Sequence, residues 1–162
     1  MDETEIWKSA GWIEQTRLLL DSYARWLGDQ LIERSGDDAE DSKRLFCAEC
    51  IVVSHGTQDD PVLNYGNARA LELWEMDVVR FTSTPSRYTA ESVERLERQK
   101  LLERTTSDGY VDDYRGIRIT STGKRFIINR AIVWNLVDSS NEYAGQAATF
   151  SDWVYESSRA PS

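Results

Sequence analysis

The sequence contains few of the side chains that disulfide frameworks and metal sites require. Its 162 residues include two cysteines, Cys47 and Cys50, and one histidine, His55. Two cysteines are too few for the disulfide framework of a small secreted protein, and they fit a reducing compartment. The C-x-x-C spacing occurs in redox and zinc motifs, but one histidine and no second cysteine pair leave a zinc site short of ligands. We therefore expect two buried apolar thiols and no metal site.

Long hydrophobic runs and excess positive charge are also missing. No apolar run approaches the roughly 20 residues of a membrane-spanning helix, and the opening MDETE is the opposite of the basic start of a secretory signal. The formal net charge of -9 works against binding to phosphates or anionic lipid. These absences predict a cytoplasmic protein that binds neither nucleic acid nor membrane.

Catalytic motifs are absent as well. The sequence has no Gly-x-Ser-x-Gly elbow and no phosphate-binding loop. Ser54 and His55 are adjacent on a predicted strand, which places their side chains on opposite faces, and the same holds for Asp112 and Asp113. We expect no catalytic residue and no enzyme; an enzyme of unknown reaction stays the second alternative.

What the chain does have is apolar and aromatic content: 40% hydrophobic residues, with six Trp and seven Tyr, predict one folded domain. The first segment, 5–34, lacks proline and carries a wide apolar stripe, so it predicts an amphipathic helix. Gly11 is a candidate for splitting that helix, and Gly28 need not stop it. We expect the break at Gly36, followed by an acidic DDAED loop.

The middle of the chain predicts short elements. Asn67 is a candidate helix cap, because its side chain can accept a hydrogen bond from a free backbone N–H, and Thr89 is another. The second helix is rich in charge, lies on the surface and ends before Gly109. The expected strands are 51–54 and 62–65, the expected helices 67–76 and 89–106, and the expected loop 81–88.

The segment 110–153 predicts a three-stranded antiparallel meander with a turn at Gly123. Its second strand has apolar rows on both faces, so both faces need cover. The helices after Asn67 and Thr89 can cover one face, and the N-terminal helix or a second subunit the other. We predict an α+β fold with a five-stranded antiparallel sheet. One row of the long strand is expected to hold Phe126, Ile128, Ile132, Trp134 and Leu136.

This order of elements resembles a PAS fold, and several sequence motifs resemble those of a particular family. VLNYGNARALELWE, FTSTPSRYTAE, GIRITSTGKRF, VWNLVD and GQAATFSDW look like the MEKHLA domain, a PAS-related module. That module occurs alone in bacteria and at the C-terminus of plant class III homeodomain-leucine zipper proteins. The resemblance spans Cys47 to Trp153 and implies a PAS-like fold with short helices on one face. By analogy, it also implies a sensory or interaction role.

The resemblance brings no agreed ligand, cofactor or reaction. A flavin photosensor of the light-oxygen-voltage type needs a reactive cysteine, and no cysteine follows Met76, so covalent flavin photochemistry is excluded. His55 could ligate haem, as in some PAS sensors, but a lone histidine at a turn is more often merely polar. We divide the chain into an N-terminal helical extension (1–44), a PAS-like domain (45–153) and a flexible tail (154–162).

Candidate ligand-binding residues are the few polar or anchoring side chains among apolar strands and helices. Two of them have a purely structural alternative: Arg130 could form an internal ion pair with Asp112 or Glu75, and Asn129, like Asn135, could bond to the backbone. The candidates are Asn64, Trp74, Arg87, Tyr114, Arg118, Asn129, Arg130, Trp134 and Gln146.

The N-terminal stripe is wider than one helix face needs for packing. A dimer or partner seam at Trp12, Leu19, Tyr23 and Trp26 is one reading, and cover of the chain's own sheet is the other. The function we expect is a non-catalytic sensory module that binds a small organic ligand and signals to a homodimer or a separate effector protein. The alternative is a ligand-free interaction or dimerisation module.

Overall fold

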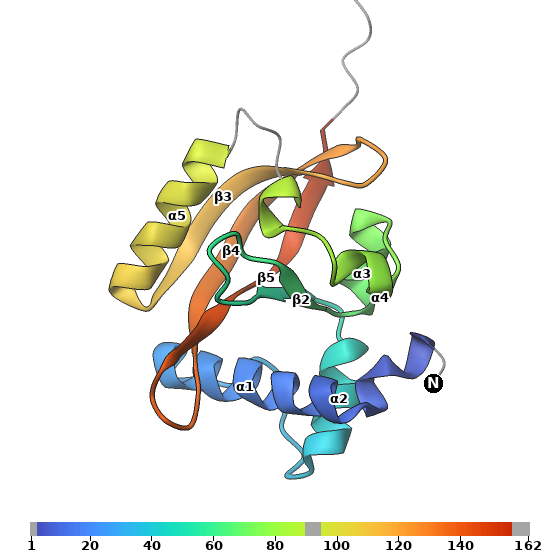
Figure 1. Cartoon of the computed structure of the whole chain (residues 1–162), viewed down its shortest axis with the longest axis vertical. Helices are drawn as coiled ribbons and strands as arrows, with labels where there is room; N and C mark the ends of the chain where they lie inside the picture. Colours follow the sequence, from blue (N-terminus) through green and yellow to red (C-terminus); the bar gives the residue numbers. More distant parts are fainter. Residues whose placement is uncertain (1–2, 90–94, 157–162) are drawn as a thin grey trace, which may run out of the picture.

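The computed structural model describes residues 3–89 and 95–156, in which a five-stranded sheet lies between two groups of helices (Figure 1). All strand pairs are antiparallel, in the order β2-β1-β5-β4-β3, so the predicted five-stranded antiparallel sheet is confirmed. The strands are β1 (Ile51–His55), β2 (Leu63–Gly66), β3 (Tyr110–Ile119), β4 (Arg125–Val137) and β5 (Tyr143–Tyr155). The helices are η1 (Glu3–Lys8), α1 (Ala10–Leu27), α2 (Asp38–Phe46), α3 (Ala68–Trp74), α4 (Val78–Phe81), η2 (Ser86–Thr89) and α5 (Arg95–Asp108).

The N-terminal helix is shorter than the sequence predicted. It begins after Ser9, whose hydroxyl accepts a hydrogen bond from Trp12 N, and not at Gly11. It ends at Gly28, which adopts a left-handed φ of 71° and donates its N–H to Ala24 O. The prediction that the helix passes Gly28 was therefore wrong, because glycine takes this terminating conformation without steric cost.

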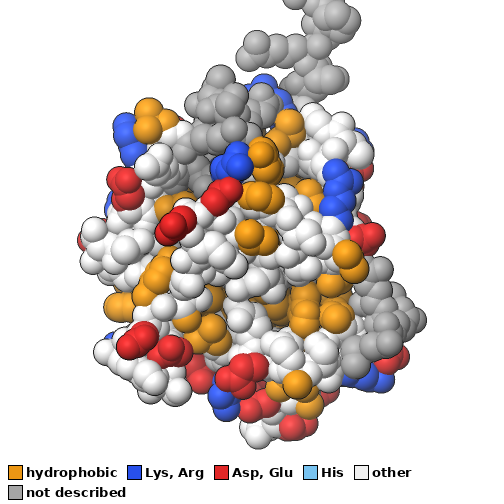
Figure 2. Space-filling model, viewed as in Figure 1, with side chains coloured by type: hydrophobic (Ala, Val, Ile, Leu, Met, Phe, Trp, Pro, Cys, Tyr) orange, Lys and Arg blue, Asp and Glu red, His pale blue; other side chains and the backbone are white. Residues whose placement is uncertain are grey.

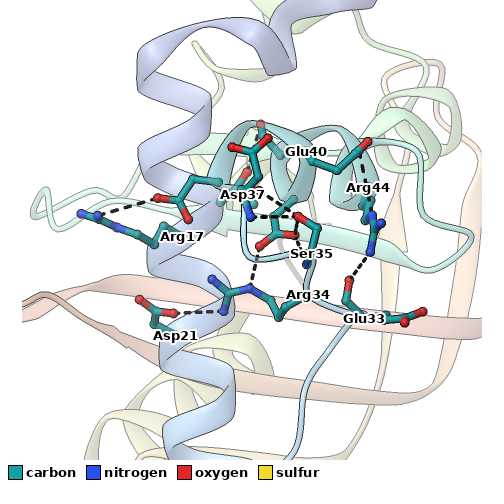
Figure 3. A network of polar contacts seen from close by, with 12 residues as sticks. Arg17, Asp21, Glu33, Arg34, Ser35, Asp37, Glu40 and Arg44 are labelled. Carbon is teal, nitrogen blue, oxygen red and sulfur yellow. Dashed lines mark hydrogen bonds and ion pairs between the residues drawn. The ribbon is translucent and has the colours of Figure 1, made fainter.

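The acidic segment predicted as a loop forms α2 instead. Its first turn holds Asp38, Glu40 and Asp41, whose negative charge is favourable at a helix N-terminus. Arg34 then joins the two helices, because it lies between Asp21 of α1 at 3.1 Å and Asp41 of α2 at 2.8 Å (Figure 3). The connection between α1 and α2 is thus held by charge pairs.

The caps of the middle helices are partly tested. Asn67 is confirmed as the cap of α3, since its Oδ1 accepts from Ala70 N at 3.2 Å. The helix predicted after Thr89 is present as α5 and ends at Asp108, but residues 90–94, on which the Thr89 cap depends, lie outside the described part of the chain. The predicted loop 81–88 contains the end of α4 and most of η2.

The long strand β4 changes the face of its apolar row half-way along. Phe126 and Ile128 pack with α3 and α4, whereas Ile132, Trp134 and Leu136 pack with α1. Irregularities in the pairing with β5, between Ile128 and Ile132, shift the alternation, so the prediction of one continuous row was wrong. Both faces of β4 are nevertheless apolar, as expected.

Two helical layers cover the sheet. Helices α1 and α2 lie side by side on one face, at the lower end of the molecule in Figure 1, and α3, α4 and α5 pack against the other. Strand β5 continues to Tyr155, so two residues assigned to the predicted tail pair with β4. None of the helices in the described ranges is long and apolar enough to cross a membrane.

Candidate functional site

A cavity lies between the sheet and the layer formed by α3, α4 and α5. Its volume is about 70 Å³, counted as the space that the centre of a water-sized sphere can reach. A cavity needs at least about 10–15 Å³ to hold one water, so this one has room for water or for a small ligand. Much of the wall is apolar and comes from Trp74, Phe81, Leu101, Ile128, Val133 and Phe150.

Four of the nine predicted ligand residues line this cavity: Trp74, Tyr114, Arg118 and Gln146. They come from α3, β3 and β5, segments that are distant in sequence and that the sheet brings together. A mostly apolar wall with a few convergent polar groups is the usual composition of a small-molecule site.

Arg118 is the charged member of the site. Only 8% of its surface is exposed; its Nη1 donates to Ile117 O at 2.9 Å, and its guanidinium carbon lies 5.3 Å from the centre of the Tyr114 ring. The Tyr114 ring can fold across the strand because Gly116 has no side chain: a Cβ there would lie 2.1 Å from the Tyr114 hydroxyl. The ring thus gives the cation a π face but no negative charge.

Trp74 places a buried donor at the cavity. It is 3% exposed, and its Nε1–H has no acceptor among the described residues. Its backbone O accepts from Ser121 N at 3.0 Å, so the end of α3 is tied to the turn between β3 and β4. In the same turn, hydroxyl hydrogen bonds from Thr122 and Thr120 hold the pKa of the Glu75 carboxyl below its ordinary value.

Gln146 is engaged with the protein itself. Its Nε2 donates to Leu102 O at 3.1 Å and to Thr106 Oγ1 at 3.0 Å in α5, and lies 3.0 Å from Asn135 Oδ1 in β4. Asn135 Nδ2 in turn donates to Thr105 O at 3.0 Å, which agrees with the predicted backbone bonding of this asparagine. The hydrogen bonds of Gln146 and Asn135 therefore hold α5 against the sheet.

The other five predicted ligand residues do not line the cavity. Asn64 faces α1: its Oδ1 accepts from Gln15 Nε2 of α1 at 3.5 Å and from Ser54 Oγ of β1 at 2.6 Å. Trp134 is fully buried on the same side and donates its Nε1–H to Leu19 O at 3.3 Å. Arg87 forms an ion pair with Asp60 at 3.0 Å on the surface.

Asn129 and Arg130 lie at the irregular part of β4. Asn129 Nδ2 donates to Asp152 Oδ1 at 3.1 Å, a side-chain partner in place of the backbone partner considered from sequence. Arg130 was predicted to contact a ligand, with an internal ion pair to Asp112 or Glu75 as the alternative, but it is exposed, and its Nε donates to the backbone O of Asp112 at 3.0 Å. The shift of alternation in β4 turns this residue outward.

Sequence reasoning missed the residues that make the space. Ala131 and Ala148 line the cavity from β4 and β5, and their small side chains leave volume that larger residues would fill. Small residues at inward positions of long apolar strands are the signal that could have revealed them. Ser86 and Thr89 of η2 also reach the cavity, and Thr89 Oγ1 donates to Ser86 O at 2.8 Å.

The four residues proposed as a dimer seam pack against the chain's own sheet. Trp12 packs against Tyr65 with the ring planes tilted by 40° and the ring centres 4.5 Å apart, and Tyr23 contacts Trp134 edge to face with the ring centres 5.1 Å apart. Leu19 is fully buried, and Trp26 donates its Nε1–H to Asn135 O at 2.9 Å. In this structure the apolar stripe of α1 therefore covers the chain's own sheet.

The cysteines and the histidine have separate surroundings. Cys47 follows α2 and is exposed, so the expectation of two buried thiols was wrong for it. Cys50 is half-buried and packs on the α1 side. Residues 3–89 and 95–156 contain no group of three or more His, Cys, Asp or Glu side chains that could hold a metal ion. His55 lines the cavity with its Nδ1 3.0 Å from Gly56 O, while the Oγ of Ser54 bonds to Asn64 on the other face.

Among known protein families, the family model of the MEKHLA domain matches residues 13–155, most of the chain. The chain belongs to the MEKHLA family. The match begins within α1, upstream of the Cys47–Trp153 span that carries the resemblance in sequence, so the family includes most of this helix. No curated protein sequence matches significantly.

Solved structures show that this MEKHLA domain has a PAS-type fold. It is similar to the PAS domain of a protein from Colwellia psychrerythraea, with a TM-score of 0.60 at 9% identity, over 68% of this chain and 91% of that one. It is also similar to the photo-excited blue-light photoreceptor Vivid, with a TM-score of 0.53 at 13% identity, over 82% and 92% of the two chains. An RNA-binding light-oxygen-voltage receptor gives 0.59 at 12% identity, over 78% of this chain and 37% of that one. Identities this low establish the fold alone.

The MEKHLA domain does not fit the cysteine photochemistry of light-oxygen-voltage flavin sensors. A reactive cysteine would have to reach the cavity, yet Cys47 and Cys50 both lie between α2 and β1 and neither lines it. A flavin–cysteine bond therefore has no residue to form it. The volume of about 70 Å³ is also small beside the several hundred Å³ of sites for larger ligands.

Proposed function

We propose that this MEKHLA domain is a non-catalytic sensory module that binds a small organic molecule in the cavity between the sheet and α3, α4 and α5. The observation that carries the proposal is a preformed cavity with convergent polar groups, on the side of the sheet opposite to α1. Protein interiors are normally close-packed, so a cavity of this size with polar groups in its wall supports a ligand-binding function.

The route by which occupancy would reach α1 passes through one residue of β4. The Asn135 side chain contacts Gln146 at the cavity, and the Asn135 backbone O accepts a hydrogen bond from Trp26 in α1. A ligand that favours one arrangement of Gln146 would therefore change the equilibrium of the contact with α1. The effect need be no larger than the 1–3 kcal/mol typical of coupling between sites.

The readout would be a second copy of the chain or a separate effector protein. Acidic side chains gather at the lower end of the molecule, over α1 and α2, in Figure 2. That charge favours a protein partner with a complementary basic surface over nucleic acid or anionic lipid. The cytoplasm stays the predicted compartment.

A ligand screen by thermal shift and native mass spectrometry tests the proposal, with two variants as controls. Ala148→Leu places a larger side chain in the cavity, whereas Ala39→Leu makes the same change at an exposed position of α2. Bound compounds should raise the melting temperature of the unaltered protein and of Ala39→Leu, and lose their effect on Ala148→Leu. Equal effects on both variants, or no bound compound, would favour the ligand-free interaction module.

A further inference from the structure

Arg118 is exceptional among the arginines because it is buried at the cavity without a carboxylate. Arg34 is more exposed, yet it pairs with both Asp21 and Asp41. Arg118 has no Asp or Glu oxygen within 4.0 Å among the described residues; its contacts are one backbone O and the Tyr114 ring. A guanidinium has five N–H donors, so most of those of Arg118 have no acceptor among the described residues.

An unpaired buried cation is costly, and a bound anion removes that cost. Burial strips a guanidinium of water, and attraction to an opposite charge is strong in such surroundings. A carboxylate matches the planar fork of N–H groups and can bind it through both oxygens. Since Arg118 is the one Arg or Lys among the lining residues that the structure describes, a monoanion balances its charge, whereas a dianionic phosphate would leave one negative charge uncompensated.

The indole of Trp74 supplies a second donor to the same ligand. Its Nε1–H is buried and has no acceptor within the described ranges. Trp74 and Arg118 both line the cavity, and the turn that follows β3 is bonded to the end of α3 through Ser121 N and Trp74 O. A ligand acceptor that reaches both would bond to donors that have no acceptor among the described residues.

Resting on the ligand-binding function proposed above, we infer that the ligand is a small monocarboxylic acid. Its carboxylate binds Arg118 and the Trp74 Nε1–H, and its apolar body lies against Phe81, Ile128 and Phe150. The cavity volume of about 70 Å³ limits the ligand to a small acid. Gln146 is already bonded to α5 and contacts the body of the ligand.

The test compares acids with their uncharged isosteres. Isobutyrate, isovalerate and benzoate, and the corresponding amides, are titrated to about 10 mM, ten times the dissociation constant of about 1 mM expected for so few atoms. Binding is followed in 15N spectra of the full chain through the Trp74 Nε1–H and Arg118 Nε–H signals, with the Trp7 indole as an internal reference. At least one acid should shift both signals and bind at least tenfold more tightly than its amide.

Matched variants identify the group responsible. Arg118→Gln should reduce the preference for acid over amide to about one, whereas Arg115→Gln, at an exposed position of the same strand, should keep it. Arg118→Lys keeps the charge and should retain part of the preference. If Arg118→Gln does not fold, Trp74→Phe takes its place, because it removes the indole donor and should weaken acid binding more than amide binding.

The outcomes separate this inference from the function on which it rests. Equal binding of acids and amides, or an acid preference unchanged in Arg118→Gln, overturns the carboxylate inference and leaves a ligand-binding module. No binding by any acid also overturns it. A neutral compound that binds in the broad screen and is blocked by Ala148→Leu would then still support the sensory function, whereas failure of that screen too would contradict both.

Discussion

The two faces of the sheet are built differently. On the α1 face, Trp134, Tyr23 and Leu19 pack closely together, and Trp134 Nε1–H donates to Leu19 O, although the buried Tyr65 hydroxyl has no hydrogen-bond partner among the described residues. On the opposite face, the apolar residues leave a cavity, and Arg118 and Trp74 keep donors without acceptors in the described part of the chain. The proposed binding site and helix α1 thus lie on opposite sides of one sheet.

This difference indicates how a small domain can retain a cavity with unpaired polar groups. Both features lower the free energy of unfolding, and they are tolerated where packing in the rest of the core compensates for that loss. Strand β4 belongs to both sides, and its change of alternation places Ala131 and Val133 at the cavity while Trp134 packs on α1. The predictions below test whether the two faces differ in energy as they do in structure.

The largest effect is expected on the filled face. Trp134→Ala removes a fully buried indole with its hydrogen bond to Leu19 O and its contact with Tyr23, and should lower the free energy of unfolding by about 4 kcal/mol. Chemical denaturation measures it, with Val79→Ala at an exposed position as the control. A loss below about 1 kcal/mol would mean that this face is not close-packed.

Two adjacent alanines of β5 compare the faces directly. Both residues border the cavity, but Ala147 is 3% exposed and belongs to the cluster around Trp134, whereas Ala148 packs with the cluster of Leu101 and Val133 on the cavity side. Ala147→Leu should destabilise by about 2 kcal/mol through overpacking, while Ala148→Leu should change stability by less than about 1 kcal/mol because it fills existing space. Equal losses in denaturant midpoints would remove the distinction between the faces.

The α1–α2 layer should be sensitive to acid through Asp41. Burial alone would raise the pKa of this carboxyl, but hydrogen bonds from Arg34 and Ser35 outweigh burial and hold the pKa below its ordinary value. The unfolded chain then binds the proton more readily, so the stabilisation is present above about pH 4 and is lost as the pH falls through the folded pKa.

Asp41→Asn should therefore lower the free energy of unfolding by about 1–2 kcal/mol at pH 7, with a smaller difference from the unaltered protein below pH 4. Asp21→Asn changes an exposed partner of the same arginine and should cost less than about 0.5 kcal/mol. A loss in Asp41→Asn that is independent of pH would show that charge is not its cause.

The smallest predicted effect is an increase in the free energy of unfolding. Arg118→Met replaces the unpaired guanidinium with an apolar chain of similar length and should raise the free energy of unfolding of the ligand-free protein by about 1 kcal/mol. Arg115→Met on the same strand should leave it within about 0.5 kcal/mol. If Arg118→Met is destabilised instead, the guanidinium stabilises the empty domain and the cavity face resembles the α1 face.

Local signals in the sequence were reliable where the physics is local. Asn67 was identified as a helix cap because one side chain and one free N–H decide that feature, and α5 ended before Gly109 as expected. The acidic stretch around Asp38 was read as a loop, since its charges suggested exposure more strongly than a helix start. Trp74, Tyr114, Arg118 and Gln146 were chosen because polar or anchoring groups stand out among apolar residues; they line the cavity, and their contact with a ligand stays a prediction.

The sequence by itself determined the family, the sheet of five strands and the need to cover both of its faces. Those properties follow from the alternation of apolar and polar residues, from helix caps and from the sequence motifs of the family, and each segment carries these features independently of the others. Only the tertiary structure decided that the N-terminal stripe covers its own sheet, that Arg130 points outward and that Arg118 lies at a cavity without a described carboxylate. The physical reason is that an irregularity in strand pairing and the volume left by distant small residues depend on neighbours that no local pattern specifies.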